Sequence, residues 1–306
     1  MNEKTKAYLA ALSFSAIIGF SFLFTKIALS YTSPLTNLAH RYTIAALVIV
    51  VLHQTKLIKV SLSRKDILSI LSILSILPMS LFYPLFFFIF QSFALQYISS
   101  SEAGILQALV PIFTLLLASA FLKEKTSLLQ KFFLFLSVAG VVFIFLSKGA
   151  NFGAETSILG FLLMLGSVLA NAINNILSKS KGGRYRAMDM TAVVIFVGFI
   201  TFNMLSLISH YLDGNILAYV APLGQLPYLL SILYLGILAS IVTGSLSIYA
   251  IVRLGASTVS VFGNLGTVLT ILVGALILHE PIYSYHVIGA TMIIAGILGM
   301  NLMRRK

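Results

Sequence analysis

The sequence has no cysteine and little charge, and each shortage excludes a class of protein. Without cysteine, the chain cannot form a disulfide framework, a thiolate metal site or a cysteine nucleophile. Asp, Glu, Lys and Arg make up only 9% of the 306 residues, against about 25% in ordinary soluble domains. Apolar residues reach 59% and the mean hydropathy is +1.04, so the composition predicts an integral membrane protein.

Acidic residues are the scarcest charged group, with 8 Asp and Glu against 20 Lys and Arg. They never fall in D-x-x-D or E-x-x-H spacing, and the histidines never fall in H-x-x-x-H spacing. An intramembrane enzyme needs paired groups of this kind, so we expect no enzyme, no metal and no cofactor. The net charge of +12 does not indicate nucleic-acid binding, because the basic residues lie in short clusters between apolar runs.

Ten apolar runs account for almost the whole chain and leave no stretch for a soluble domain. A membrane-spanning helix needs about 20 apolar residues, and these runs are too long for barrel strands and lack strict alternation. The first run is longer than a signal-peptide core and has no clear cleavage site after it, so we expect it to be retained. The expected spans are 8–30, 35–53, 67–95, 101–122, 129–147, 157–178, 190–211, 226–250, 256–278 and 284–303.

Lysine and arginine are distributed unevenly between the two sides of these spans. All but three of the 20 basic residues fall on the side that holds both termini, and the exceptions are Lys26, Arg41 and Lys148. Cytoplasmic loops carry the excess of Lys and Arg in membrane proteins. The distribution therefore predicts ten helices with both termini in the cytoplasm.

The two halves of the chain repeat each other at a constant interval. The segment Ala94–Glu102 leads into a span that ends at Glu124, and the segment Ala250–Thr258 leads into one that ends at Glu280. Each half then holds five spans, and an odd number makes the second half enter the membrane from the opposite side. The expected fold is an all-α membrane protein in which two inverted-topology five-helix repeats surround a central cavity.

The repeated segments resemble the EamA-type domain of the drug/metabolite transporter superfamily. The pattern in the first copy is Ala94-Leu-x-Tyr97, Ser101-x-Ala103, Pro111, Leu122-x-Glu124 and Ala139-Gly140. The pattern in the second copy is Ala250, Leu254-Gly-Ala-Ser257, Leu278-His-Glu280-Pro281, Gly289-Ala290 and Ala295-Gly296. The resemblance covers essentially the whole chain. It implies two EamA-like repeats, 1–150 and 151–306, in a multi-pass protein of the bacterial cytoplasmic membrane that exports amino acids, other metabolites or toxic compounds.

Two positions depart from the family pattern. Thr267 stands where the second copy usually carries proline, which leaves the bend of the ninth span open. Ile18 stands where a tryptophan commonly precedes Gly19, so an aromatic side chain that often faces the substrate path is missing.

Polar residues within the spans are expected to face a shared interior, because a hydrogen-bonding side chain in hydrocarbon must face another helix or water. The clearest set is a single stripe on the sixth span, where side chains recur at helical spacing. Polar residues that only join helices to each other are the alternative. The candidate substrate-binding residues are Ser21, Thr25, Lys26, Tyr83, Gln91, Gln107, Asn171, Asn174, Asn175, Ser178, Thr243, Ser247 and Asn264.

Three charged residues near the span ends have specific expected roles. Lys26 either extends its ammonium group to the membrane interface or forms a cation at the cavity mouth that attracts a carboxylate. Arg41 begins the second span and is expected to be an interfacial anchor. Glu280 is expected to pair with basic loop residues rather than to carry protons.

These features favour a secondary transporter that moves a small polar metabolite by alternating access, and the resemblance implies export of an amino acid or related compound. The first alternative is export or import of another metabolite or drug, such as a nucleobase, a carboxylate or a toxic compound. A passive channel and an intramembrane lipid-modifying enzyme are less favoured alternatives. The expected partners are the lipid bilayer and a small-molecule substrate, without nucleic acid. The fifth and tenth spans are almost entirely apolar, so they are expected to brace the halves or to pair protomers in a homodimer.

Overall fold

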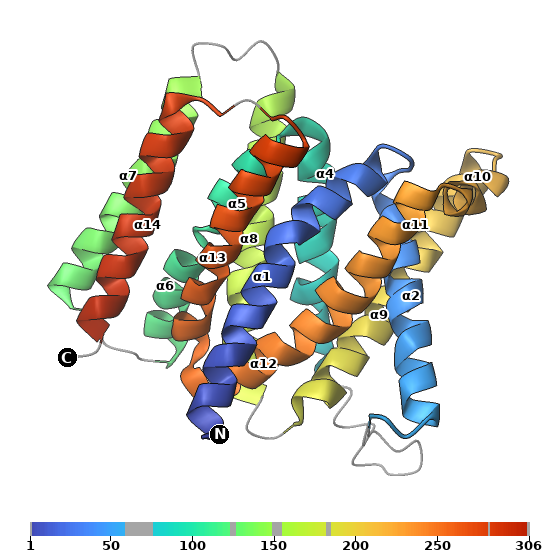
Figure 1. Ribbon diagram of the computed structural model, residues 1–306, viewed down its shortest axis with the longest axis horizontal. Helices are drawn as coiled ribbons and strands as arrows, with labels where there is room; N and C mark the ends of the chain where they lie inside the picture. The colour runs from blue at the N-terminus through green and yellow to red at the C-terminus, as the bar shows by residue number, and fades with distance from the viewer. Residues whose placement is uncertain are drawn as a thin grey trace.

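The computed structural model is a bundle of helices that describes residues 2–58, 76–122, 127–148, 155–181, 185–280 and 282–304. Every regular element within these ranges is helical, which confirms the all-α prediction. Both termini lie at one end of the bundle, called here the terminal end (Figure 1). The opposite end, where α4 (Phe87–Tyr97) gives way to α5 (Ser100–Gln107), is called the distal end.

Seven helical stretches of the described chain are long and apolar enough to cross a membrane, with shorter apolar helices at Leu265–Ile277 and Ser284–Gly296. The chain is thus an integral multi-pass protein, while the count of ten spans stays a prediction. The remaining elements are α1 (Glu3–Leu29), α2 (Pro34–Gln54), η1 (Leu81–Phe86), α6 (Val110–Leu122), α7 (Leu128–Lys148), α8 (Glu155–Lys181), α9 (Ala187–Leu212), α10 (Leu217–Val220), η3 (Ala221–Gly224), α11 (Leu226–Leu233), η4 (Tyr234–Val242), α12 (Thr243–Leu254), α13 (Ala256–Ile277) and α14 (Ser284–Arg304).

Local sequence fixes where several helices begin. The Ser33 hydroxyl accepts from the backbone N–H of Thr36, and Pro34 occupies the first turn of α2, where its missing N–H is not needed. At α5, the Ser99 hydroxyl accepts from the Glu102 N–H, and the Glu102 carboxylate accepts from the Ser99 N–H. This reciprocal capping box starts α5 immediately after the chain leaves α4.

Two spans of the first half are interrupted at proline. The backbone of Tyr83, with φ −138° and ψ 109°, is non-helical directly before Pro84 within η1. The span after Ser99 divides into α5 and α6 just before Pro111, because proline removes a backbone donor and its ring clashes with the preceding turn. In the second half α13 is continuous through Thr267, the position where the family pattern usually has proline. The helix is therefore unbroken where this proline is missing.

The helices pack in matched sets. α1 packs against α12 and α13, α8 packs against α4, α5 and α6, α2 packs against α9, and α7 packs against α14. The approach of α1 to α13 depends on small residues: a Cβ atom on Gly19 would lie 2.6 Å from the Leu269 Cβ. The Thr270 hydroxyl donates to the Gly19 carbonyl at 3.0 Å and ties the two backbones together.

Candidate substrate-binding cavity

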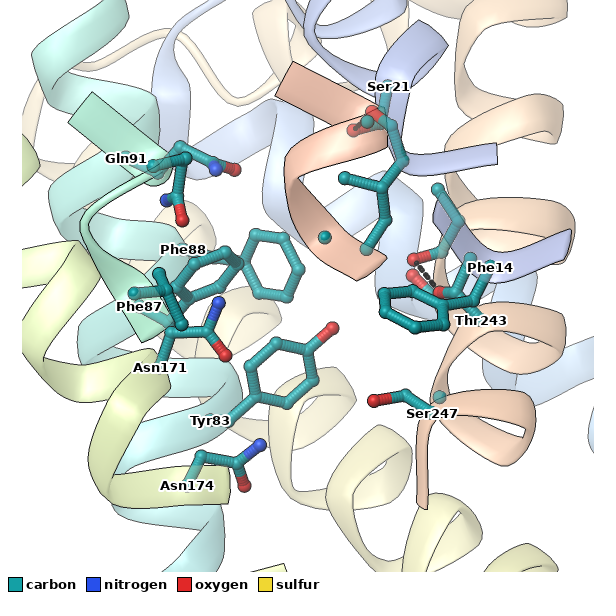
Figure 2. A pocket seen from close by; sticks show the side chains of 18 of the residues that line it. Phe14, Ser21, Tyr83, Phe87, Phe88, Gln91, Asn171, Asn174, Thr243 and Ser247 are labelled. Atoms are coloured by element: carbon teal, nitrogen blue, oxygen red, sulfur yellow. Dashed lines mark hydrogen bonds between the residues drawn. The ribbon is translucent and has the colours of Figure 1, made fainter. Parts of the chain in front are cut away.

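A cavity lies in the middle of the bundle, enclosed by helices from both halves. Its empty volume is ≈ 1190 Å³, which includes space open to the outside, so it has room for a small metabolite. Figure 2 shows Tyr83, Asn171 and Asn174 on one side and Thr243 and Ser247 on the other. No described residue of α7 or α14 lines the cavity, and these two helices stand side by side at one edge of the bundle (Figure 1).

Most of the candidate residues identified in the sequence line this cavity. The polar stripe of the sixth span faces it through three asparagines, opposite the hydroxyl groups of α12. The candidates that line it are Ser21, Tyr83, Gln91, Gln107, Asn171, Asn174, Asn175, Thr243 and Ser247. Their position is therefore established, whereas their role in binding a substrate stays a prediction.

Three candidates are not among the cavity-lining residues. The Thr25 hydroxyl donates to the Ser21 carbonyl at 2.7 Å, and the Ser178 hydroxyl lies 3.8 Å from the Met79 sulfur. Lys26 is in the last turn of α1 at the distal end, within the electrostatic field of two carboxylates there. Local partners thus account for the side chains of Thr25 and Ser178. Asn264, the remaining candidate, has a side chain outside the part of the chain that the structure describes.

The side-chain amide groups that line the cavity differ in how many hydrogen bonds they form with the protein. The Asn175 amide nitrogen donates to the Thr114 hydroxyl at 3.4 Å, and the Gln107 amide nitrogen lies 3.5 Å from the Ser167 hydroxyl. The Asn174 side-chain oxygen is buried and has no hydrogen-bond partner within the described residues. Because buried polar groups are almost always paired, an acceptor that no described residue uses is unusual.

Arg41 lines the cavity, and the prediction that it is an interfacial anchor is wrong. Its side chain is only 3% exposed, about two turns inside α2. Its Nε donates to the Ser240 hydroxyl and its Nη2 to the Ala239 carbonyl, each at 2.9 Å, and the guanidinium lies 4.1 Å from the centre of the Phe88 ring. Acceptors on η4 and an aromatic face thus replace water around this cation.

Other lining residues were not singled out by the sequence. Thr191 on α9 and Ser240 on η4 both contribute hydroxyl groups. An isolated threonine or serine in an apolar run gives no periodic signal, because its hydroxyl can bond to its own helix. Thr191 does so, donating to the Ala187 carbonyl at 2.9 Å.

The distal end is closed by a second charged residue, Glu280, which lies between α13 and α14. Its carboxylate accepts from the backbone N–H and the hydroxyl of both Ser100 and Ser101, at 2.7 to 2.9 Å. We call these four hydrogen bonds the distal contact. Burial raises the pKa of Glu280, but the hydrogen bonds from Ser101 and Ser100 outweigh it, so the pKa lies below its ordinary value of 4.5.

The distal contact corrects a prediction, because the partners of Glu280 are serines at a helix start rather than basic loop residues. A helix N-terminus presents free N–H groups and a partial positive charge, which suits a carboxylate. Glu124, the counterpart of Glu280 in the first half, lies outside the described residues. Among those described, no group of three or more His, Cys, Asp or Glu side chains could hold a metal ion.

Comparison with known proteins identifies the family. The profile of the EamA-like transporter family matches residues 5–146 and 158–302. The uncharacterized transporter YcxC of Bacillus subtilis (strain 168) is 41% identical over 305 residues, covering 100% of this chain and 96% of that protein. The uncharacterized transporter YvbV of the same organism is 27% identical, covering 97% and 92%.

A solved crystal structure shares the fold, with a TM-score of 0.67 and 20% sequence identity over 98% of both chains. The family match extends over both halves of the chain and therefore includes every helix that lines the cavity. The chain belongs to the EamA-like transporter family, part of the drug/metabolite transporter superfamily, and is a membrane transporter.

Proposed function

We propose that the protein is a secondary transporter that exports a small polar metabolite, an amino acid or related compound, across the bacterial cytoplasmic membrane by alternating access. The observation that carries the proposal is the central cavity, whose wall combines amide and hydroxyl groups from both halves of the chain. A few placed polar groups in a largely apolar pocket are typical of a small-molecule site. Side chains such as Gln91 and Asn171 are rare inside a membrane unless they face a pathway.

The matched packing supports two inverted repeats, residues 1–150 and 151–306. If the first five spans correspond to the last five, the packing of α1 on α12 and α13 corresponds to the packing of α8 on α4, α5 and α6. The pair of α2 and α9 joins the second span of each half, and the pair of α7 and α14 joins the fifth span of each half, so exchanging the halves leaves both pairs unchanged. Inverted repeats around a central site are the architecture in which one half rocks against the other.

The proposed orientation places the terminal end in the cytoplasm, as the distribution of Lys and Arg indicates. The distal contact then lies on the outer side, where it joins the N-terminus of α5 to the segment after α13. Release of an exported substrate would require these two elements to separate. The distal contact is therefore the closed form of the outer exit.

The pair formed by α7 and α14 is proposed to brace the halves or to form the contact of a homodimer. The two helices pack closely, since a Cβ atom on Gly140 would lie 2.8 Å from the Gly289 carbonyl. Phe132 and Phe135 on α7 are exposed, at 59% and 70%. Exposed aromatic side chains on a spanning helix suit either lipid or a second copy of the chain.

The family and the named relatives are transporters, so the protein is not an enzyme. A passive channel is the alternative that a flux measurement decides. In proteoliposomes preloaded with unlabelled amino acids, a carrier gives saturable uptake of labelled amino acid that the internal pool accelerates. A channel gives flux without this acceleration.

The test of the substrate class uses inside-out vesicles, labelled amino acids and related metabolites. We expect at least one amino acid or related compound to accumulate or exchange. An Asn174→Leu variant should insert normally but lose transport, whereas Leu212→Ala, at an exposed helix end, should behave as wild type. If neither amino acids nor related metabolites exchange, the substrate assignment is wrong.

A further inference from the structure

Arg41 gives the cavity a single positive charge. It is the only charged side chain among the described residues that line the cavity. Arginine stays protonated in any protein environment, so this charge is permanent. No carboxylate accompanies this cation among the described residues that line the cavity.

The protein fixes the guanidinium on one edge only. Its Nε and Nη2 donate to η4, and the Ser240 hydroxyl that accepts from Nε in turn donates to the Leu235 carbonyl at 2.8 Å. The Phe88 ring covers a face of the guanidinium. Arginine offers five N–H donors in a rigid fork, and Nη1 donates no hydrogen bond within the described part of the chain.

A buried cation of this kind needs a counter-charge. Removing a charge from water is expensive unless an opposite charge and hydrogen bonds replace the solvent. No carboxylate forms an ion pair with Arg41 among the residues that the structure describes. The unused donors and the missing counter-charge coincide at the cavity, so both requirements can be met by a bound molecule.

We infer that the transported molecule carries a carboxylate, which binds to Arg41 through the donors that η4 leaves unused. The inference rests on the proposed transport function and names its substrate class. A planar carboxylate matches the planar fork of arginine and neutralises the cavity. Asn174 lines the same cavity, and we assign its side-chain amide to the rest of the molecule, either an ammonium group or a hydroxyl.

Lys26 does not compete for this role. It is not among the cavity-lining residues, and the carboxylates of Glu102 and Glu280 lie close enough to influence it. The Lys26 ammonium group therefore interacts with the carboxylates of the distal end. Arg41 is the cation that a molecule inside the cavity would meet.

The test measures counterflow in proteoliposomes with matched inhibitors. Each inhibitor pair consists of a carboxylic acid and its primary amide, drawn from the protein amino acids and from short hydroxy acids. We expect the acids to inhibit counterflow and their amides to be weaker by about ten- to a hundredfold, because the amide loses a charge-assisted hydrogen bond. Inhibition by amino acids alone assigns a zwitterion, and inhibition by hydroxy acids assigns a monoanion.

Variants of Arg41 supply a second, independent test of the same inference. Arg41→Gln should raise the KM for the acid by about ten- to a hundredfold and remove the discrimination between acid and amide, while Arg41→Lys should restore part of it. Arg253→Gln, at an exposed ion pair with Glu3, is the control and should leave both unchanged. The inhibitor series on the wild-type protein stands even if Arg41→Gln fails to fold.

The outcomes separate the two proposals. Counterflow of a compound without a carboxylate, or equal inhibition by acids and amides, would overturn the role of Arg41 and leave the transporter intact. If Arg41→Gln still discriminates between acids and amides as wild type does, the role of Arg41 is overturned as well. Absence of counterflow for every compound would instead overturn the proposed transport function.

Discussion

Glu280 at the distal end and Arg41 in the cavity wall are both charged side chains at least partly removed from water, yet their surroundings differ. The Glu280 carboxylate accepts four hydrogen bonds and has no need of a further partner. The Arg41 guanidinium is fixed on one edge, while Nη1 donates to no described residue. A charged group whose hydrogen bonds are all made within the protein joins two elements of the fold. A charged group with unused donors is available to a ligand. The comparison therefore separates a structural charge from a proposed binding charge.

The largest effect on stability is expected from Glu280→Ala. Four donors lose a charged acceptor at about 1 kcal/mol each or slightly less, so we expect the free energy of unfolding to fall by about 3 kcal/mol. Glu280→Gln should lose roughly half of this. Thermal unfolding in detergent gives the measurement, and Glu3→Ala, at an exposed site, is the control. An unchanged Tm in Glu280→Ala would mean that the distal contact does not hold the fold.

A smaller effect is expected from Gly274→Ala, which alters the same contact without removing the charge. The added Cβ would lie 2.5 Å from the Ser101 hydroxyl and 2.6 Å from a Glu280 carboxylate oxygen, so one of them must move. We expect a loss of about 1–2 kcal/mol. The loss should largely vanish in a Glu280→Ala background, because both changes act on one contact. Full additivity in this double-mutant cycle would contradict the assignment.

Stability should also depend on pH through Glu280. Its pKa is lowered in the folded protein, so its contribution is complete above the ordinary glutamate value of 4.5 and is lost as the pH falls through the lower folded value. Wild type should therefore lose Tm more steeply than Glu280→Gln as the pH is lowered below 4.5. Parallel acid profiles would show that the carboxylate contributes nothing.

The smallest effect on stability is expected from Arg41→Gln, although it should abolish efficient transport. Replacing a buried charge that lacks a counter-ion removes a desolvation penalty along with two hydrogen bonds. We expect the free energy of unfolding to stay within about 1 kcal/mol of wild type. A loss as large as that of Glu280→Ala would show that Arg41 is a structural charge, and the contrast between the two residues would disappear.

Regular patterns in the sequence predicted the helices and much of the cavity wall. The asparagines of α8 recur at helical spacing, which is sufficient to place Asn171 and Asn174 on one face. The interruptions at Tyr83 and before Pro111 each lie next to a proline of the sequence. Such features are local, because they depend only on helix geometry and on the missing donor of proline.

The placement of single residues could not be predicted in the same way. Whether Arg41 reaches water or a cavity depends on η4, whose π-helical turn brings Ser240 and Ala239 to α2 from a distant part of the sequence. Thr25 has the polarity of a site residue, but its hydroxyl bonds to its own helix. These outcomes depend on tertiary packing, which periodicity does not encode.

The most direct test of the account is the shift in Tm that a transported carboxylate produces in wild type, Arg41→Gln and Glu280→Gln. A ligand that binds only the folded protein raises the Tm by mass action. We predict a clear rise in wild type and in Glu280→Gln, and little or none in Arg41→Gln at the same ligand concentration. An equal rise in Arg41→Gln and wild type would contradict the claim that Arg41 binds the substrate.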